Sequence, residues 1–139
     1  MASTAAIIGA GTRISYAAHP TPGTFTDLAE VFSVGFPEMS ENDVRATHYL
    51  SPGRVHEYIS GWREGGEVTV EANYVKAEMA TVHGMRGQMR TWRITLPDGA
   101  TETWPGYIKT IWMSIPMDDK VTTTLTIKVA GDPTYTPGV

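Results

Sequence analysis

The sequence contains no cysteine, which excludes both disulfide bonds and thiolate chemistry. A cysteine-free chain fits a reducing compartment. With 139 residues, the chain is long enough to bury a core without covalent staples. Its apolar fraction of 41% and charged fraction of 19% are those of an ordinary globular protein. We therefore expect one domain spanning residues 1–139, held together by a hydrophobic core.

Basic residues are also scarce. Eleven Lys and Arg face fifteen Asp and Glu, and the net charge of −4 argues against a surface made to grip phosphates. The N-terminus lacks a basic region and a sustained apolar run, so neither a secretory signal nor a membrane span is expected. These absences predict a soluble protein made in the cytoplasm, with no membrane partner.

Motifs for enzyme chemistry are missing too. The four histidines share no metal-ligand spacing, and Ser60 stands where a zinc-protease helix starting at His56 would need its second ligand. The Gly-x-Gly of residues 9–11 resembles the start of a dinucleotide-binding turn. However, Ile14 replaces the third small residue, and no long helix can follow it. We predict no catalytic residue, no cofactor and no metal.

The four tryptophans could stack the bases of single-stranded nucleic acid, but such a site needs a basic groove alongside. The eleven basic residues are spread along the chain instead. Tryptophan in a small all-β protein is more often a core residue or a subunit contact. A monomeric ligand-binding β-domain, with a groove lined by Trp62 or Trp104, remains an alternative.

Strand patterns dominate what is present. Residues 121–131 alternate strictly, with Val121, Thr123, Leu125, Ile127 and Val129 on one face. Residues 88–104 read as two strands joined at a Pro-Asp-Gly turn, with Trp92, Ile94 and Leu96 on one face and Arg90 further out. Shorter strands are predicted over 13–18, 29–36, 43–49 and 67–74, the last with Val68 and Val70 inward.

One helix interrupts the strands. Asn73 is a plausible N-cap, and Val75, Met79, Val82 and Met85 recur at helical spacing. Gly84 or Gly87 would close the helix. A single helix among about seven strands predicts a mainly β protein, a sandwich or barrel with one flanking α-helix.

Residues 107–116 are apolar on both faces of the expected strand. Ile108 and Trp112 fall on one face, and Tyr107, Ile111, Met113 and Ile115 on the neighbouring phases. A strand covered on both sides in so small a protein indicates a sandwich interior on one face and a subunit contact on the other.

Residues 47–74 resemble the major tail tube protein of long, non-contractile-tailed phages, the lambda-like siphophages, and of related tail-like particles. The matching positions are Thr47-His48, Ser51-Pro52, Glu57, Ile59-Ser60-Gly61, Gly66-Glu67 and Asn73-Tyr74. Downstream, the Pro-Asp-Gly turn, the Gly106-Tyr107 strand and the Thr-rich strand ending at Gly131 follow the order of that family. The resemblance covers residues 28–131. No added C-terminal domain is expected.

This resemblance implies a β-sandwich with one helix, and rings of six subunits stacked into a hollow tube that delivers the genome. It implies an N-terminal arm (residues 1–11), an inter-ring stacking loop (47–66) and a C-terminal tail (132–139). The arm and the tail have too little apolar surface to pack on their own domain. The expected contact residues are Ser51, Pro52, Arg54, Glu57, Ile59, Trp62, Arg63, Glu64, Tyr107, Ile111 and Met113.

The implied partners are further copies of the chain, a tape-measure protein and a tail-tip complex. Double-stranded DNA would pass through the lumen without tight binding. The protein would assemble in the host cytoplasm and reside in the virion tail. The same fold would also suit an alternative function, that of an inner tube or tail-completion protein in a contractile or tailocin-type particle. Acids such as Glu67, Glu71, Asp118 and Asp119 could make the lumen negative, with basic residues paired to acids elsewhere.

Overall fold

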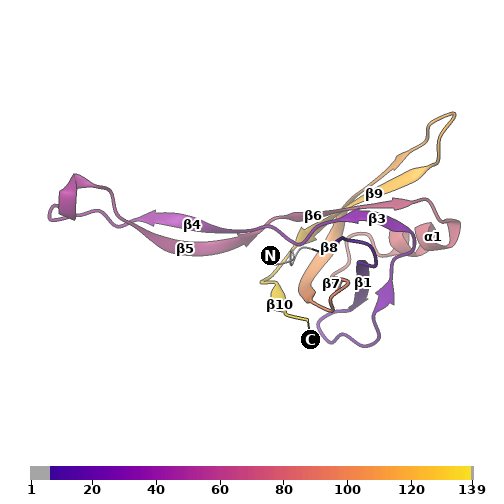
Figure 1. Cartoon of the computed structure of the whole chain (residues 1–139), viewed down its shortest axis with the longest axis horizontal. Coiled ribbons are helices and arrows are strands. Elements are labelled where there is room, and N and C mark those ends of the chain that lie inside the picture. The colour runs from indigo at the N-terminus through magenta and orange to yellow at the C-terminus, as the bar shows by residue number, and fades with distance from the viewer. Residues whose placement is uncertain (1–6, 139) are drawn as a thin grey trace, which may run out of the picture.

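The computed structural model describes residues 7–138 of the chain. Figure 1 shows a body of curled sheet with one helix beside it, from which a long two-stranded ribbon projects. The elements are β1 (Arg13–Ala18), β2 (Thr26–Asp27), β3 (Val31–Val34), β4 (Met39–Arg45), the 3-10 turn η1 (Pro52–Arg54), β5 (Tyr58–Gly65), β6 (Glu67–Asn73), α1 (Lys76–Gly84), β7 (Arg90–Thr95), β8 (Thr101–Ser114), β9 (Thr122–Val129) and β10 (Thr134–Thr136). A mainly β fold with one flanking helix is confirmed.

Eight strands form one antiparallel sheet in the order β2-β1-β7-β8-β9-β6-β3, with β10 paired to β8. Leu28, which directly follows β2, extends the β1–β2 pairing by donating its backbone N–H to the carbonyl of Ile14. The chain then continues into β3 at the other end of the strand order, and the sheet is curled (Figure 1). β4 and β5 form a separate two-stranded sheet, and this is the projecting ribbon.

The core fills the concave side of the curled sheet. Trp92 and Trp104, which face each other across β7 and β8, are fully buried, and Trp92 Nε1 donates a hydrogen bond to the carbonyl of Gly106. Val82 and Met85, at the end of α1, close the cluster. Each such apolar side chain contributes about 1.5–3 kcal/mol to folding by leaving water. The core is therefore sufficient to hold the body together.

The alternation predicted for β9 is confirmed. Thr123, Leu125, Ile127 and Val129 are buried and their neighbours are half-buried, although the strand itself begins after Val121. In β6, the buried positions are Val68 and Val70, as expected. The turn between β7 and β8 is also as predicted: Gly99 has φ 92°, and its N–H donates to the carbonyl of Leu96.

The predicted N-cap of the helix is wrong. Asn73 is the last residue of β6, where it pairs with Thr122 of β9 and donates its N–H to the carbonyl of Glu30. Sheet pairing outweighs its capping preference, and Val75 occupies the N-cap position without a side-chain bond. The helix ends at Gly84, which is one of the two glycines predicted to close it.

Strand limits before the helix also differ from the prediction. β3 covers only Val31–Val34 of the expected 29–36. β4 starts at Met39 and ends at Arg45, so the expected strand over 43–49 overlaps it only in part. The pairing stops because the Thr47 hydroxyl accepts the N–H of Glu57, where a backbone carbonyl would continue the ladder.

The two chain ends behave differently. The predicted N-terminal arm lies outside the described residues over 1–6, and its Ile7 and Ile8 are exposed. The C-terminal tail, expected not to pack on its own domain, does pack there. β10 pairs with the start of β8, and the ring of Tyr135 lies 6.3 Å from that of Phe36. Backbone pairing supplies the attachment that its few apolar side chains do not.

Candidate subunit interface

The β4–β5 ribbon exposes apolar side chains that the body does not cover. Trp62 is 87% exposed, and Val44, Tyr58 and Ile59 are exposed as well. The ribbon is a sheet of only two strands, so both of its outer edges have unpaired backbone groups. A two-stranded sheet is only marginally stable in water by itself. The ribbon therefore has an exposed apolar surface that a partner could bind, and it would gain stability from that contact.

The tip of the ribbon, residues 46–57, is held in shape by polar contacts around Glu57. The Glu57 carboxylate accepts a hydrogen bond from Ser51 Oγ at 2.6 Å and lies 3.5 Å from His48 Nε2. The hydroxyl of Thr47 accepts the Glu57 N–H at 2.9 Å. His48 Nδ1 accepts the N–H of Leu50, which leaves the ring proton on Nε2, facing the carboxylate.

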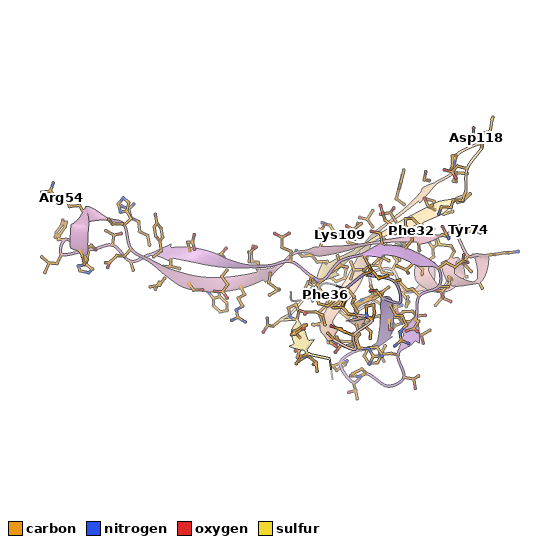
Figure 2. All side chains as sticks on the ribbon, in the orientation of Figure 1. Phe32, Phe36, Arg54, Tyr74, Lys109 and Asp118 are labelled. Carbon is orange, nitrogen blue, oxygen red and sulfur yellow. The ribbon has the colours of Figure 1, made fainter. Side chains whose placement is uncertain are left out.

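The same segment carries three apolar side chains, Tyr49, Leu50 and Val55, which we call the tip cap. Their exposed fractions are 107%, 86% and 65%. Arg54 lies beside them, and Figure 2 shows it at the far end of the ribbon. A group of large apolar residues held out into solvent by an ordered polar base is typical of a contact surface.

A β-bulge interrupts the ribbon near its base. Glu41 pairs with Arg63 and Asp43 with Ser60, so one residue of β4 faces both Gly61 and Trp62 of β5. The extra residue puts Ser60 and Arg63 on the same face, although a regular strand would place them on opposite faces. Both donate to the Glu41 carboxylate, with Arg63 Nε at 3.0 Å.

These contacts change the titration of Glu41 and link the ribbon to the body. The hydrogen bond from Ser60, and then the charge of Arg63, hold the pKa of Glu41 below its ordinary value. Arg63 Nη1 also lies 3.5 Å from Asp132 Oδ2, just before β10. Arg63 thus connects β4, β5 and the C-terminal segment.

A hollow of about 650 Å³ lies where the ribbon joins the body, and we call it the base hollow. It is lined by Met39, Val44, Gly61, Trp62, Arg63, Gly65, Val129, Ala130, Gly131 and Asp132. Its side chains are mainly apolar, with the Arg63–Asp132 pair on the rim. Gly65 has no room for a side chain, because a Cβ there would lie 2.6 Å from Val129 Cγ1.

The second half of β8 offers a different surface. From Tyr107 to Ser114, β8 pairs with β9 alone, so within residues 7–138 its other edge has no strand partner. Trp112 is 60% exposed, and Ile115 and Met117, beyond the strand, are 73% and 102% exposed. β8 and β9 form a hairpin with residues 115–121 at its end. Figure 2 shows Asp118 there, on the opposite side of the body from Arg54.

In the part of the chain that the structure describes, no cluster of three or more His, Asp or Glu side chains could hold a metal ion. The only helix described there, α1, is too short to cross a membrane.

A family model described as the lambda phage tail tube protein matches residues 8–136, most of the chain. The chain belongs to this family. It is therefore a tail tube protein of a phage or phage-like particle, and the family is structural rather than enzymatic. No curated protein sequence matches the chain.

Solved structures share the fold. One protein from the tail of an empty GTA particle, determined with C6 symmetry, is 20% identical, with a TM-score of 0.76 over 95% of this chain and 100% of that one. A protein of the anti-feeding prophage baseplate is 13% identical, with a TM-score of 0.73 over 99% of both chains. The SPP1 tail tube protein is 12% identical, with a TM-score of 0.73 over 96% of this chain and 81% of that one.

The expected stacking loop of this tail tube protein is not a loop throughout. Residues 58–65 form β5, and only the tip is irregular. The contact residues predicted between 51 and 64 therefore separate into two groups. Ser51, Pro52, Arg54 and Glu57 belong to the tip, whereas Ile59, Trp62, Arg63 and Glu64 belong to β5.

The faces predicted for the second half of β8 are reversed by a bulge. Ile108 pairs with Ile127 and Thr110 with Thr126, so Lys109 is an extra residue. Beyond it, Ile111 packs against the core, whereas Trp112 is exposed.

Met113, opposite the buried Thr123, is half-buried on the same face as Ile111. The expectation that Ile108 and Trp112 share a face was therefore wrong. The expected contacts of Ile111 and Met113 with other subunits stay a prediction, although both side chains lie on the core face within the subunit. Tyr107 precedes the bulge and points away from Ile108, as predicted.

Sequence reasoning missed the tip cap and the exposed end of the β8–β9 hairpin. A signal for the tip was present, because Tyr49 and Leu50 are adjacent apolar residues immediately before a Ser-Pro-Gly turn. Both residues lie in the turn at the end of the ribbon, beyond β4, and a sheet of only two strands has no second layer there to bury them.

Proposed function

We propose that the chain forms rings of six subunits that stack into a hollow tail tube, through which the genome passes. The observation that carries this proposal is the β4–β5 ribbon, which projects from the body with exposed apolar residues at its tip and along β5. A solitary domain would not maintain such a surface in water. The GTA tail protein of the same fold was determined with C6 symmetry, which supports six subunits to a ring.

Contacts within a ring would use the open edge of β8. Its backbone groups from Tyr107 to Ser114 are free to pair with a strand of the neighbouring subunit. The exposed Trp112 and the half-buried Tyr107 lie on the face away from the core and would be covered at the same time. Repeated around six subunits, this pairing closes a barrel and covers the open edge of β8 in every subunit.

Contacts between rings would use the ribbon, with Trp62 and Ile59 on β5 and the residues around Pro52 at its tip. Subunits would remain soluble until a tail-tip complex and a tape-measure protein nucleate stacking in the host cytoplasm. The first six residues lie outside the described part of the chain, and we retain the expectation that the N-terminal arm contacts neighbours.

The lumen would conduct double-stranded DNA without holding it, because each phosphate neutralised by a fixed cation strengthens binding. Lys109 already pairs with Glu67 within the subunit, at 2.6 Å. Lys128 donates to the carbonyl of Gly65, and Arg93 lies 4.0 Å from the centre of the Phe25 ring. Preformed tubes should therefore not retain duplex DNA at physiological salt, which a filter-binding assay measures.

Electron microscopy of the concentrated, purified protein tests the proposal. We expect hollow tubes of stacked rings with six-fold end views. Isolated rings that never stack would favour a tail-completion protein, and the likeness to the anti-feeding prophage baseplate protein keeps a contractile-type particle as a second candidate. A protein that stays monomeric at every concentration, with or without tail-tip and tape-measure proteins, would refute the tube.

A further inference from the structure

We propose that the tip cap of one subunit inserts into the base hollow of a second copy of the chain. This inference rests on the proposed stacking of subunits and identifies the surface that receives the ribbon. It links two features at opposite ends of the same ribbon: exposed apolar side chains at the tip, and an apolar recess at the base.

The tip cap is shaped for insertion before any partner is present. Ser51, Thr47 and His48 all bond to the Glu57 side chain or backbone, so the loop that carries Leu50 and Val55 is already closed. A preorganised loop loses less conformational entropy on binding than a disordered one. Exposure of 86% for Leu50 means that nearly all of its apolar surface is still available to a partner.

The base hollow matches the tip in chemistry. Met39, Val44, Val129 and Ala130 give it apolar walls. Gly61 and Gly131 add no side chains that would fill it. A hollow with such walls gains free energy when an apolar side chain displaces its water.

Charges at the two ends of the ribbon are complementary. The tip, residues 46–57, has one guanidinium group, Arg54, and one carboxylate, Glu57, and a second guanidinium group, Arg45, lies next to it at the end of β4. Around the base hollow the balance is opposite. Three acids, Glu41, Asp132 and Glu102, lie around it, and Arg63 pairs with the first two. A second base, Lys128, donates to the carbonyl of Gly65, another lining residue.

The negative field at the base has a local effect. Burial, and then the charge of Asp132, raise the pKa of Glu102. An arriving Arg54 would relieve this repulsion as it brings the tip cap to the rim. Complementary charges of this kind favour one orientation of docking over others.

The occupant must be another copy because a subunit cannot fill its own hollow. β5 alone has eight residues, which extend about 26 Å at 3.3 Å per residue. Because β4 and β5 are paired along their length, the closed tip is held away from Gly65, Val129 and Gly131 at the body end of the hollow. A contact between different surfaces of identical subunits can be repeated from one ring to the next and so propagate as an open stack.

Engineered cysteines test this directly, since the chain has none of its own. In the Leu50→Cys/Ala130→Cys double variant, a short bismaleimide should join each subunit to the next in assembled tubes. Denaturing gels should then show a ladder of covalent oligomers. The matched control is Leu50→Cys/Ala77→Cys, whose second cysteine lies on the exposed side of α1 and should give no ladder.

A mixture of the two single variants, Leu50→Cys and Ala130→Cys, should give covalent dimers and nothing larger, because each subunit then has one reactive end. A covalent link formed within one chain would overturn the proposal, since the ribbon would then fold back on its own base. Tubes that are normal by electron microscopy but give no ladder would overturn it while leaving stacking intact. Absence of tubes from the cysteine-free chain would instead refute the proposed function itself.

Photo-crosslinking identifies the occupant independently. A photoreactive amino acid at position 130, in tubes of otherwise unchanged sequence, should capture a peptide from residues 46–57. Capture of residues 7–11 or 114–120 would overturn the proposal, because the N-terminal segment or the β8–β9 hairpin would then fill the hollow.

Substitutions of Arg54 test the role of charge. Arg54→Glu should weaken polymerisation at least tenfold, whereas Arg54→Lys should retain it. Equal polymerisation of the two variants would contradict the role assigned to charge.

Discussion

Arg63 and Asp132 form an ion pair between the ribbon and the segment that leads into β10, with Nη1 and Oδ2 3.5 Å apart. The two residues are far apart in the sequence, and neither strand pattern indicates the contact. Because the ribbon is otherwise joined to the body through its backbone at Gly65 and Met39, this pair helps to fix the direction in which the ribbon projects.

Replacing Asp132 with Asn should loosen the ribbon without unfolding the body. The pair is exposed, and exposed ion pairs contribute only about 0–1 kcal/mol. We therefore expect an unchanged melting temperature within about 2 °C, with faster amide exchange over Gly61–Gly65. Asp118→Asn is the control, since Asp118 has no ion-pair partner within residues 7–138. Equal exchange in the two variants would contradict a positioning role.

Acidic substitutions should separate core from contact surface. Leu125 is 4% exposed, and Leu125→Asp would bury an unpaired charge, which costs several kcal/mol and should unfold the subunit. Trp62 is 87% exposed, so Trp62→Asp should preserve the fold and abolish stacking. Circular dichroism measures the first effect and electron microscopy the second. A folded Leu125→Asp subunit, or normal tubes of Trp62→Asp, would contradict these assignments.

The Glu67–Lys109 pair should add stability over a defined pH range. The hydrogen bond and charge of Lys109 lower the pKa of Glu67, so its contribution is present above the ordinary carboxyl pKa and is lost as the pH falls. Glu67 raises the pKa of Lys109, so that contribution is lost as the pH rises past the ordinary ammonium pKa. The window is therefore about pH 4.5 to 10.5.

A double-mutant cycle with Glu67→Gln and Lys109→Met, followed by urea unfolding, measures this coupling. We expect a favourable interaction at pH 7 that disappears at pH 3 and weakens in high salt. Both side chains are exposed, so the interaction will be small. A coupling that is the same at pH 3 and pH 7 would rule out the ionic contribution.

Glu57→Ala should loosen the ribbon tip. The change removes the acceptor for Ser51 Oγ and the partner of His48, at a local cost of about 1 kcal/mol for each lost hydrogen bond. Amide exchange should rise at Ser51 and Leu50 while the body is unaffected. Glu57→Gln retains an acceptor oxygen and serves as the control. If Ser51 exchanges as fast in the unmodified subunit as in Glu57→Ala, the tip is not preorganised.

The exchange rates also decide whether the predicted stacking loop is mobile or ordered in the free subunit. The glycines and the low apolar density of Gly53–Gly66 predict a segment that is mobile in the free subunit and ordered in the tube. In the structure, β5 is paired along its length, and the tip has its own polar network. Hydrogen exchange of the free subunit measures which description holds in solution.

Gly106→Ala tests how closely β8 and β9 approach. A Cβ at Gly106 would lie 2.5 Å from the Lys128 carbonyl oxygen, so the strands must separate, at a cost of about 1–3 kcal/mol. Gly84→Ala is the contrast, because a Cβ there meets nothing within 4 Å, and alanine favours the helix by about 0.5–1 kcal/mol. Opposite shifts in melting temperature should result.

The sequence by itself determined those features that depend on local pattern. Alternation placed Leu125 and Ile127 in the core, because a strand with one buried face must repeat every two residues. The Pro97–Gly99 turn followed from the fixed negative φ of proline, the tolerance of glycine for positive φ, and the apolar strands on either side. Ordered motifs over most of the chain indicated the tail tube family.

The tertiary structure alone decided features that depend on pairing between distant segments. An extra residue at Lys109 exchanged the faces of Ile111 and Trp112, and only the register with β9 reveals it. β10 folds back because the start of β8 has an open edge, not because of its own composition. The ribbon forms because β4 pairs with β5. The bulge in this pairing lets Ser60 and Arg63 contact the same carboxylate, that of Glu41. Backbone hydrogen bonding is nearly independent of side-chain identity, so sequence patterns cannot specify which strand edges meet.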